Sequence, residues 1–183
     1  MSEELIIKHC APTLAGMKTG NMFSCRCEDE KELRDTLRKW NQILVKRGLR
    51  VLPLKFQKKR ALIYVYRPSK LSNDLKDETA CRLLCERGYG METPERCIVQ
   101  LMKRIKDYEE FPHEVGLFLG YPPEDVRGFI ENKACDCKCV GCWKVYGDAN
   151  EAQKTFEKYK KCTDVYSRQY ANGKGIDRLA VAG

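Results

Sequence analysis

The chain has 183 residues, with 34 basic and 26 acidic side chains, 11 cysteines and a formal net charge of +8. This length suits a single hydrophobic core, and 43% hydrophobic residues exclude wholesale disorder. The longest apolar run, residues 61–66, is far shorter than the roughly 20 residues that span a bilayer. The start is acidic and lacks the apolar segment of a signal peptide, so we expect a cytoplasmic protein whose thiols stay reduced.

The N-terminal region is expected to hold a short apolar element, a strand and a helix. The apolar element at residues 5–7 should end near Pro12, because proline disfavours helical conformation in the residue before it. Residues 21–27 are compatible with a short strand. A helix follows, with acidic residues at its start and Gly48 beyond its end, as helix dipole and C-cap preferences favour. The apolar residues of its core face recur every three or four positions: Leu33, Leu37, Trp40 and Leu44.

Two strands at residues 49–56 and 60–67 are predicted to form a hairpin with a polar turn at 57–59. The second strand contains the apolar run at 61–66, which is typical of a central strand buried on both faces. Pro53 cannot donate a ladder hydrogen bond, so the first strand should lie at an edge of the sheet.

The second half of the chain is predicted to be mostly helical. Asp148 and Glu151 have the spacing of a capping box at the start of the last helix. We therefore expect one α+β domain over residues 1–183, with a small, mostly antiparallel sheet around a hairpin at about 49–67 and several packing helices. The other elements expected in this half are helices at 73–87, 93–108, 112–119 and 123–131 and a strand at 143–146.

The excess positive charge is confined to residues 46–70. This segment holds nine basic residues and no acid, so the rest of the chain carries 25 basic and 26 acidic residues. A concentrated basic patch can attract nucleic acid or another anion, and Arg60 and Arg67 are the candidate anion-binding residues. The alternative is a solvated hairpin with basic edges.

Four motifs closely resemble the bacterial family known as domain of unknown function 3793. They are HCAPTLAGMK at 9–18, FPHEVGLFLGYP at 111–122, DVRGFIENK at 125–133 and GCWKVY at 141–146. Matches at residues 159–162 and 172–174 extend the resemblance over essentially the whole chain. The family has no established activity. The resemblance implies an origin in anaerobic bacteria and a link to redox or metal metabolism.

Each of the two histidines lies in a motif beside a reactive group. His9 precedes Cys10, and His113 precedes Glu114. A thiolate needs a base or positive charge nearby, and a histidine needs a carboxylate or carbonyl to fix its tautomer. If the fold brings the motifs together, we expect Cys10 as nucleophile, His113 as base and Glu114 as its orienting group. His9 would belong to the same site, and Lys18 would bind an anionic substrate group. The alternatives are a mononuclear zinc or iron site or a buried structural Cys10.

Four thiols lie within residues 135–142 and form a second candidate site for zinc or iron. Two of them have the CxxC spacing of zinc knuckles, and Cys25 and Cys27 could complete a site with two of the four. A reduced exposed loop and disulfide switching are the alternatives. There is no Walker loop or GxGxxG motif, so no nucleotide cofactor is indicated. The four cysteines of this loop are Cys135, Cys137, Cys139 and Cys142.

Overall fold

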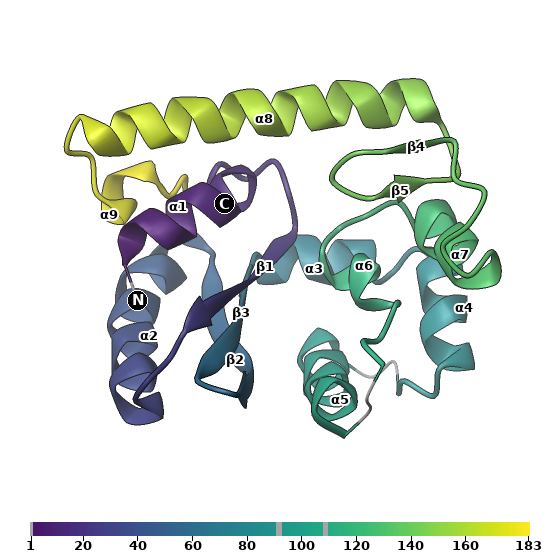
Figure 1. Cartoon of the computed structure of the whole chain (residues 1–183), viewed down its shortest axis with the longest axis horizontal. Helices are drawn as coiled ribbons and strands as arrows, with labels where there is room; N and C mark the ends of the chain where they lie inside the picture. The colour runs from purple at the N-terminus through teal and green to yellow at the C-terminus, as the bar shows by residue number, and fades with distance from the viewer. Residues whose placement is uncertain (1, 91–92, 108–109) are drawn as a thin grey trace. The chain divides into compact units, whose positions relative to one another are not determined.

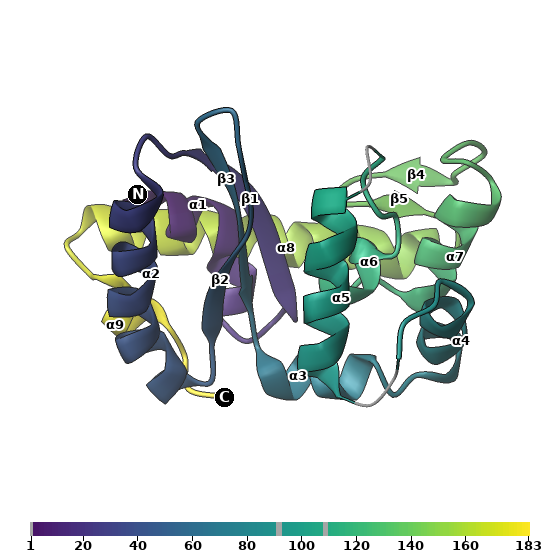
Figure 2. The same cartoon turned by 90° about the horizontal axis from the view of Figure 1, so that it is seen from below.

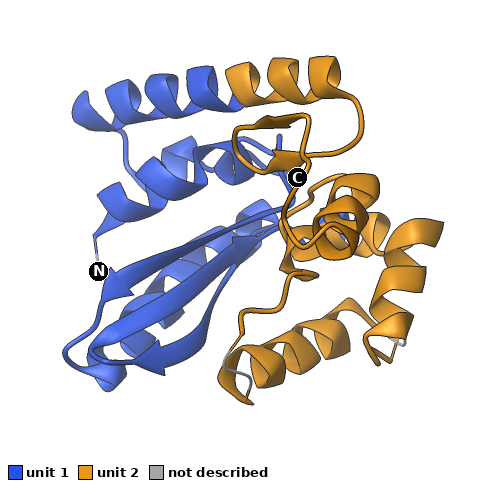
Figure 3. Cartoon of the chain, turned by 45° about the vertical axis from the view of Figure 1, so that its right-hand side comes forward, with its two compact units in different colours: residues 1–70, 159–183 blue, residues 71–158 orange. Residues whose placement is uncertain are grey.

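A computed structural model describes residues 2–90, 93–107 and 110–183. The described chain combines helices with a small antiparallel sheet, which confirms the predicted α+β class. It forms two compact units, drawn in blue and orange in Figure 3. Unit 1 comprises residues 1–70 and 159–183, and unit 2 comprises residues 71–158. In the sequence, unit 2 lies between the two segments of unit 1.

Unit 1 is built on a three-stranded sheet in the order β1-β3-β2, with both pairs antiparallel. The strand β3 is central and β2, with Pro53, is an edge, as the sequence predicts. Helices α1, α2 and α9 lie on the same side of this sheet (Figures 1 and 2). The elements are α1 (Glu3–Leu14), β1 (Gly20–Arg26), α2 (Glu30–Leu44), η1 (Val45–Arg47), β2 (Arg50–Gln57), β3 (Arg60–Tyr66), α9 (Ile176–Leu179) and the C-terminal part of α8 (Ala149–Ala171).

The core of unit 1 follows from strand alternation and helix periodicity. Phe23 on β1 and Ala61 and Ile63 on β3 point to the same face and pack against the helices. All four residues of the predicted helix stripe are buried in α2: Leu33, Leu37, Trp40 and Leu44.

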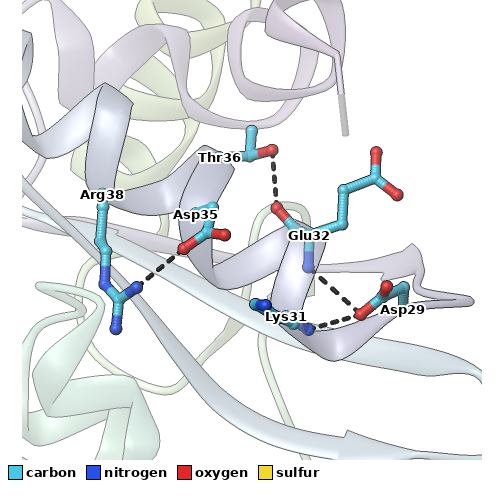
Figure 4. Close-up of polar contacts among 6 residues, drawn as sticks. All are labelled: Asp29, Lys31, Glu32, Asp35, Thr36 and Arg38. Carbon is cyan, nitrogen blue, oxygen red and sulfur yellow. Dashed lines mark hydrogen bonds and ion pairs between the residues drawn. The ribbon is translucent and has the colours of Figure 1, made fainter.

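Asp29 begins α2 by capping its first turn. Its carboxylate accepts hydrogen bonds from the backbone N–H groups of Lys31 at 2.7 Å and Glu32 at 3.2 Å (Figure 4). One turn later, Arg38 donates to Asp35 at 2.7 Å on the exposed face. The acidic start of this helix therefore satisfies backbone donors as well as the helix dipole.

The helix end predicted near Pro12 is wrong, because α1 continues to Leu14. A proline in the last turn has a φ compatible with helix, and its missing N–H removes a single hydrogen bond. The carbonyl of Pro12 then accepts from the N–H groups of Met17 at 2.9 Å and Lys18 at 3.1 Å. Gly16, with a φ of +74°, provides the left-handed residue at which the chain leaves the helix.

Unit 2 is a set of short helices with a two-stranded hairpin. The single helix predicted over 73–87 is two helices, because Asp77 accepts from the N–H groups of Thr79 and Ala80 at 2.9 and 3.0 Å and starts a new one. The helix predicted over 112–119 is shorter, and Tyr108 lies outside the described residues. The elements are α3 (Pro68–Asp74), which begins in unit 1, α4 (Glu78–Glu86), α5 (Pro94–Asp107), α6 (Val115–Phe118), α7 (Pro123–Glu131), β4 (Cys139–Val140), β5 (Lys144–Val145) and the start of α8.

In the part of the chain that the structure describes, no helix is both long enough and apolar enough to cross a membrane.

Candidate functional site

Three of the four motifs meet in unit 2 around one cavity of about 310 Å³. The segment before α6, the turn between α6 and α7, helix α7 and the β4–β5 hairpin each contribute to its wall. The lining is mostly apolar, with one imidazole, one carboxylate and one ammonium group, from His113, Asp125 and Lys144. The principal apolar residues are Phe111, Val115, Tyr121, Phe129, Val140 and Trp143.

Asp125 connects α7 to the β4–β5 hairpin. One carboxylate oxygen accepts from Nε1 of Trp143 at 2.6 Å, and the other accepts from the N–H groups of Tyr146 and Gly147, both at 2.7 Å. The side chain is buried, so these three donors replace the water that would otherwise solvate its charge. Asp125 thereby fixes the orientation of the indole that forms one wall of the cavity.

Aromatic packing holds that wall in place. The rings of Tyr121 and Trp143 are stacked with centroids 4.9 Å apart, and Phe156 meets Trp143 edge-on at 4.6 Å. A side chain at Gly141 would collide with Phe156, so the hairpin needs glycine there. Burial, aided by the nearby Cys142 thiol, raises the pKa of Tyr121 to about 12, and its hydroxyl donates to the carbonyl of Cys142 at 3.1 Å.

His113 and Glu114 are adjacent in sequence but engage different partners. His113 lines the cavity, where its ring meets Phe129 edge-on with centroids 5.0 Å apart and its Nε2 lies 3.2 Å from a carboxylate oxygen of Glu110. Glu114 is buried, and its carboxylate accepts from the Tyr89 hydroxyl at 3.0 Å. The carboxylate beside the imidazole is therefore Glu110, whereas Glu114 belongs to a buried network.

That network holds Glu114 between helix α5 and the loop that follows α4. Arg104 on α5 lies 3.7 Å from the Glu114 carboxylate and stacks over the ring of Tyr89, with 4.9 Å between the guanidinium and the ring centroid. Burial, the charge of Glu114 and their hydrogen bond raise the pKa of Tyr89, which stays protonated and donates. These contacts make Glu114 a structural anchor of the segment that carries His113.

The HCAPTLAGMK motif lies in unit 1. Cys10 lies on α1 and is fully buried in the core of unit 1. This burial raises the pKa of its thiol far above the ordinary value, and the positive charge of Lys18 opposes the shift. The neighbouring His9 is exposed and stacks on Phe23 with centroids 5.2 Å apart. Lys18 is buried, and its ammonium lies 5.9 Å from the centroid of the Tyr159 ring. The structure thus brings Lys18 within electrostatic range of Cys10 and turns His9 to the surface.

The cysteine loop, residues 135–142, leads into the β4–β5 hairpin and includes β4. Cys135 and Cys142 are exposed, and Cys137 and Cys139 are half-buried. Among the described residues, no three His, Cys, Asp or Glu side chains are grouped closely enough to hold a metal ion. A zinc or iron site on these thiols stays a prediction.

The two arginines of the basic segment have different environments. Arg67 is 1% exposed, and its guanidinium donates to the carbonyls of Thr13, Leu14 and Val181 at 2.7–2.8 Å. It therefore ties the end of α1 to the C-terminal segment of unit 1. Arg60 lies at the surface, where Nε donates to the Ser24 hydroxyl at 3.0 Å.

Sequence reasoning places His113 in a candidate site but misses the aromatic residues around it. Phe129 lies on α7, and a phenylalanine on an amphipathic helix usually faces the core, so it gives no distinct signal of a cavity. The signal that could have found the cavity is the aromatic content of the three motifs together, in Phe111, Tyr121 and Trp143. Val140, 68% exposed at the rim, gives no sequence signal at all.

Comparison with known families gives one match. Residues 6–180 match the family described as "Protein of unknown function (DUF3793)". Neither the curated proteins nor the solved structures give a match to this chain.

Proposed function

Because the chain belongs to the DUF3793 family, whose description assigns no activity, we propose a function from the cavity itself: unit 2 binds a small planar molecule between its aromatic side chains. The observation that carries this proposal is the convergence of three motifs on one cavity with aromatic walls. Phe111 and Val140, at 46% and 68% exposure, leave apolar surface uncovered at this place.

The size and chemistry of the cavity indicate the class of ligand. About 310 Å³ is at the lower end of the volumes of small-molecule sites, roughly 300–1,000 Å³, and suits a molecule of one or two rings. Phe129 and Trp143 offer ring faces and edges to such a molecule, and each aromatic contact contributes about 0.5–1.5 kcal/mol beyond the burial of area.

His113 supplies the polar contact that would orient the ligand. Its imidazole lies in the wall of a mostly apolar cavity, and Glu110 at Nε2 favours the tautomer that carries the proton on that nitrogen. The other ring nitrogen is then an acceptor. We expect a ligand whose ring carries an N–H or O–H group.

The thiol-dependent alternative at Cys10 has less support. A nucleophilic cysteine must be a thiolate, and burial raises the pKa of Cys10 and keeps it protonated at neutral pH. Binding in the cavity requires no thiolate. Catalysis or metal binding by Cys10 with His113 and Glu114 stays a separate hypothesis.

The test measures binding of one- and two-ring aromatic compounds, with phenol and 2-quinolinone as first probes, by ligand-observed NMR. A Val140→Phe variant narrows the cavity at its exposed rim, and Val99→Phe, 51% exposed on α5, is the matched control. We expect binding by the parent and Val99→Phe and at least a tenfold loss in Val140→Phe. Failure of the parent to bind, or equal affinity in both variants, would show that the cavity is not a ligand site.

A second readout uses the two tryptophans. Trp40 lies in the core of unit 1 and Trp143 in the cavity wall, so a Trp40→Phe protein reports on the cavity alone. Probe binding should change the emission of Trp143 in that protein. In a Trp143→Phe protein, the emission of Trp40 should not change.

A further inference from the structure

We propose a second binding site, in unit 1, for a phosphate group. It lies at the turn end of the β2–β3 hairpin, in a hollow of about 270 Å³ lined by Ser24, Lys55, Gln57, Lys58, Arg60 and Leu62. Three of these six residues are cationic, two carry neutral polar groups and none is acidic. The proposal is independent of the cavity in unit 2.

A β-bulge places Lys55 in this hollow. On β2, Val51 and Pro53 pair with Val65 and Ile63 of β3, and the register then shifts so that Lys55 pairs with Leu62. Without the extra residue, Lys55 would point to the same face as Val51, which packs against the helices. The bulge reverses the alternation and turns Lys55 to the opposite face of the sheet.

The remaining donors lie on the same face of the sheet. Gln57 pairs with Arg60 and Ser24 with Leu62, so these side chains share the face of Lys55. Arg60 is held by Ser24, whose hydroxyl accepts from Nε at 3.0 Å and whose carbonyl accepts from Nη2 at 3.3 Å. Both acceptors are neutral, so they position the guanidinium without cancelling its charge.

The two turn positions carry lysines, although asparagine and glycine are preferred there. Lys58 and Lys59 have φ values of +49° and +59°, as in the two-residue turn that prefers Asn-Gly. A left-handed conformation is strained for a residue with a side chain, because Cβ approaches the following carbonyl oxygen. Strained residues of this kind concentrate at functional sites. Here both strained residues are lysines at the tip of the hairpin.

Glu28 pairs with two cations at the outer part of this cluster. Glu28 lies 2.6 Å from Arg26 and 3.3 Å from Lys59, and neither of these cations lines the hollow. The lining itself, with three cations and two neutral polar side chains, matches a compact anion with several acceptor oxygens.

The two tyrosines on this face of the sheet are too buried to recognise a nucleobase. Tyr64 and Tyr66 are stacked with centroids 4.7 Å apart, but they are 0% and 3% exposed and cannot stack on a nucleobase. The chemistry that remains is recognition of a phosphate group, as a free phosphate ester or within a nucleic-acid backbone.

The test uses inorganic phosphate, followed by calorimetry, and a fluorescent oligothymidylate, followed by anisotropy at several salt concentrations. The variant Lys58→Asn/Lys59→Gly installs the preferred turn and removes two charges. We expect it to raise Tm and to weaken binding at least tenfold. Thermal stability and affinity should thus move in opposite directions, which a merely structural turn would not produce.

The control Lys103→Gln/Lys106→Gln removes two charges from the helix α5 and should bind as the parent does. Binding of phosphate indicates a free phosphate ester, and binding of the oligonucleotide alone indicates a nucleic-acid backbone, with a salt slope that falls by about 1 in the turn variant. Either result supports the site. Absence of binding to both probes, or an equal loss in the control, overturns it.

Discussion

The indole N–H of Trp143 donates to the carboxylate of Asp125 at 2.6 Å, and this bond links the first turn of α7 to the β4–β5 hairpin. The other oxygen of Asp125 accepts from the N–H groups of Tyr146 and Gly147. One buried carboxylate thus satisfies three donors that come from a different element. The aromatic cavity depends on this link, because Trp143 forms part of its wall.

Asp125→Asn should destabilise unit 2 by about 2–4 kcal/mol. The amide keeps the shape of the carboxylate, but its NH₂ group faces donors in place of an acceptor, and a buried donor is left unsatisfied. Urea unfolding of a Trp40→Phe protein, followed by the emission of Trp143, measures the loss. Glu131→Gln on the same helix breaks only an exposed contact of 3.9 Å with Arg127 and should change stability by less than about 1 kcal/mol. Equal stability of the two variants would contradict the role of Asp125.

The sequence predicts the elements whose signals are local. The stripe of α2, the edge position of Pro53 and the cap of α8 at Asp148 all follow from spacing and residue type, and the structure confirms them. The helix boundaries that the sequence does not predict are those where a single residue changes the structure expected from its neighbours. Asp77 starts a new helix inside the segment predicted as one helix over 73–87, and Pro12 is tolerated within α1.

The site was less predictable because it depends on contacts between distant residues. Asp125 and Trp143 are 18 residues apart, and Arg67 reaches a carbonyl 114 residues away. In the sequence Arg67 is one of nine similar cations, and only burial separates it from Arg60. Likewise, His113 and Glu114 are neighbours in sequence, but the fold gives the imidazole Glu110 as its carboxylate partner.

Arg67→Met should destabilise unit 1 by about 3 kcal/mol or more. Methionine fills the space but leaves the carbonyls of Thr13, Leu14 and Val181 without the donors that they have in the native structure. Chemical unfolding followed by Trp40 emission in a Trp143→Phe protein measures the effect. Arg50→Met, at an exposed position of β2, is the matched control and should stay within about 0.5 kcal/mol of the parent. A similar small change for Arg67→Met would mean that water replaces the guanidinium.

Native Cys10 should react slowly with thiol reagents. Its thiol is fully buried and burial raises its pKa, whereas Cys85 and Cys142 are exposed. Brief alkylation with iodoacetamide at pH 7.5, followed by peptide mass spectrometry, should label the two exposed residues at least a hundredfold faster than Cys10. All three should react at similar rates in urea. Rapid labelling of Cys10 in the folded protein would instead favour the thiol-dependent hypothesis.

The buried thiol of Cys10 should also make unit 1 less stable in alkali. Burial raises its folded-state pKa above the ordinary 9.0, so between these two values the folded state holds a proton that the unfolded state loses. Its contribution to stability is fully present below pH 9.0 and falls by up to about 1.4 kcal/mol per pH unit above it. Urea unfolding followed by Trp40 emission, in a Trp143→Phe background between pH 8 and 10.5, measures this slope. Cys10→Ala should flatten the slope, whereas Cys85→Ala, at an exposed position, should not. Identical slopes in the two variants would show that Cys10 ionises as readily in the folded chain as in the unfolded one.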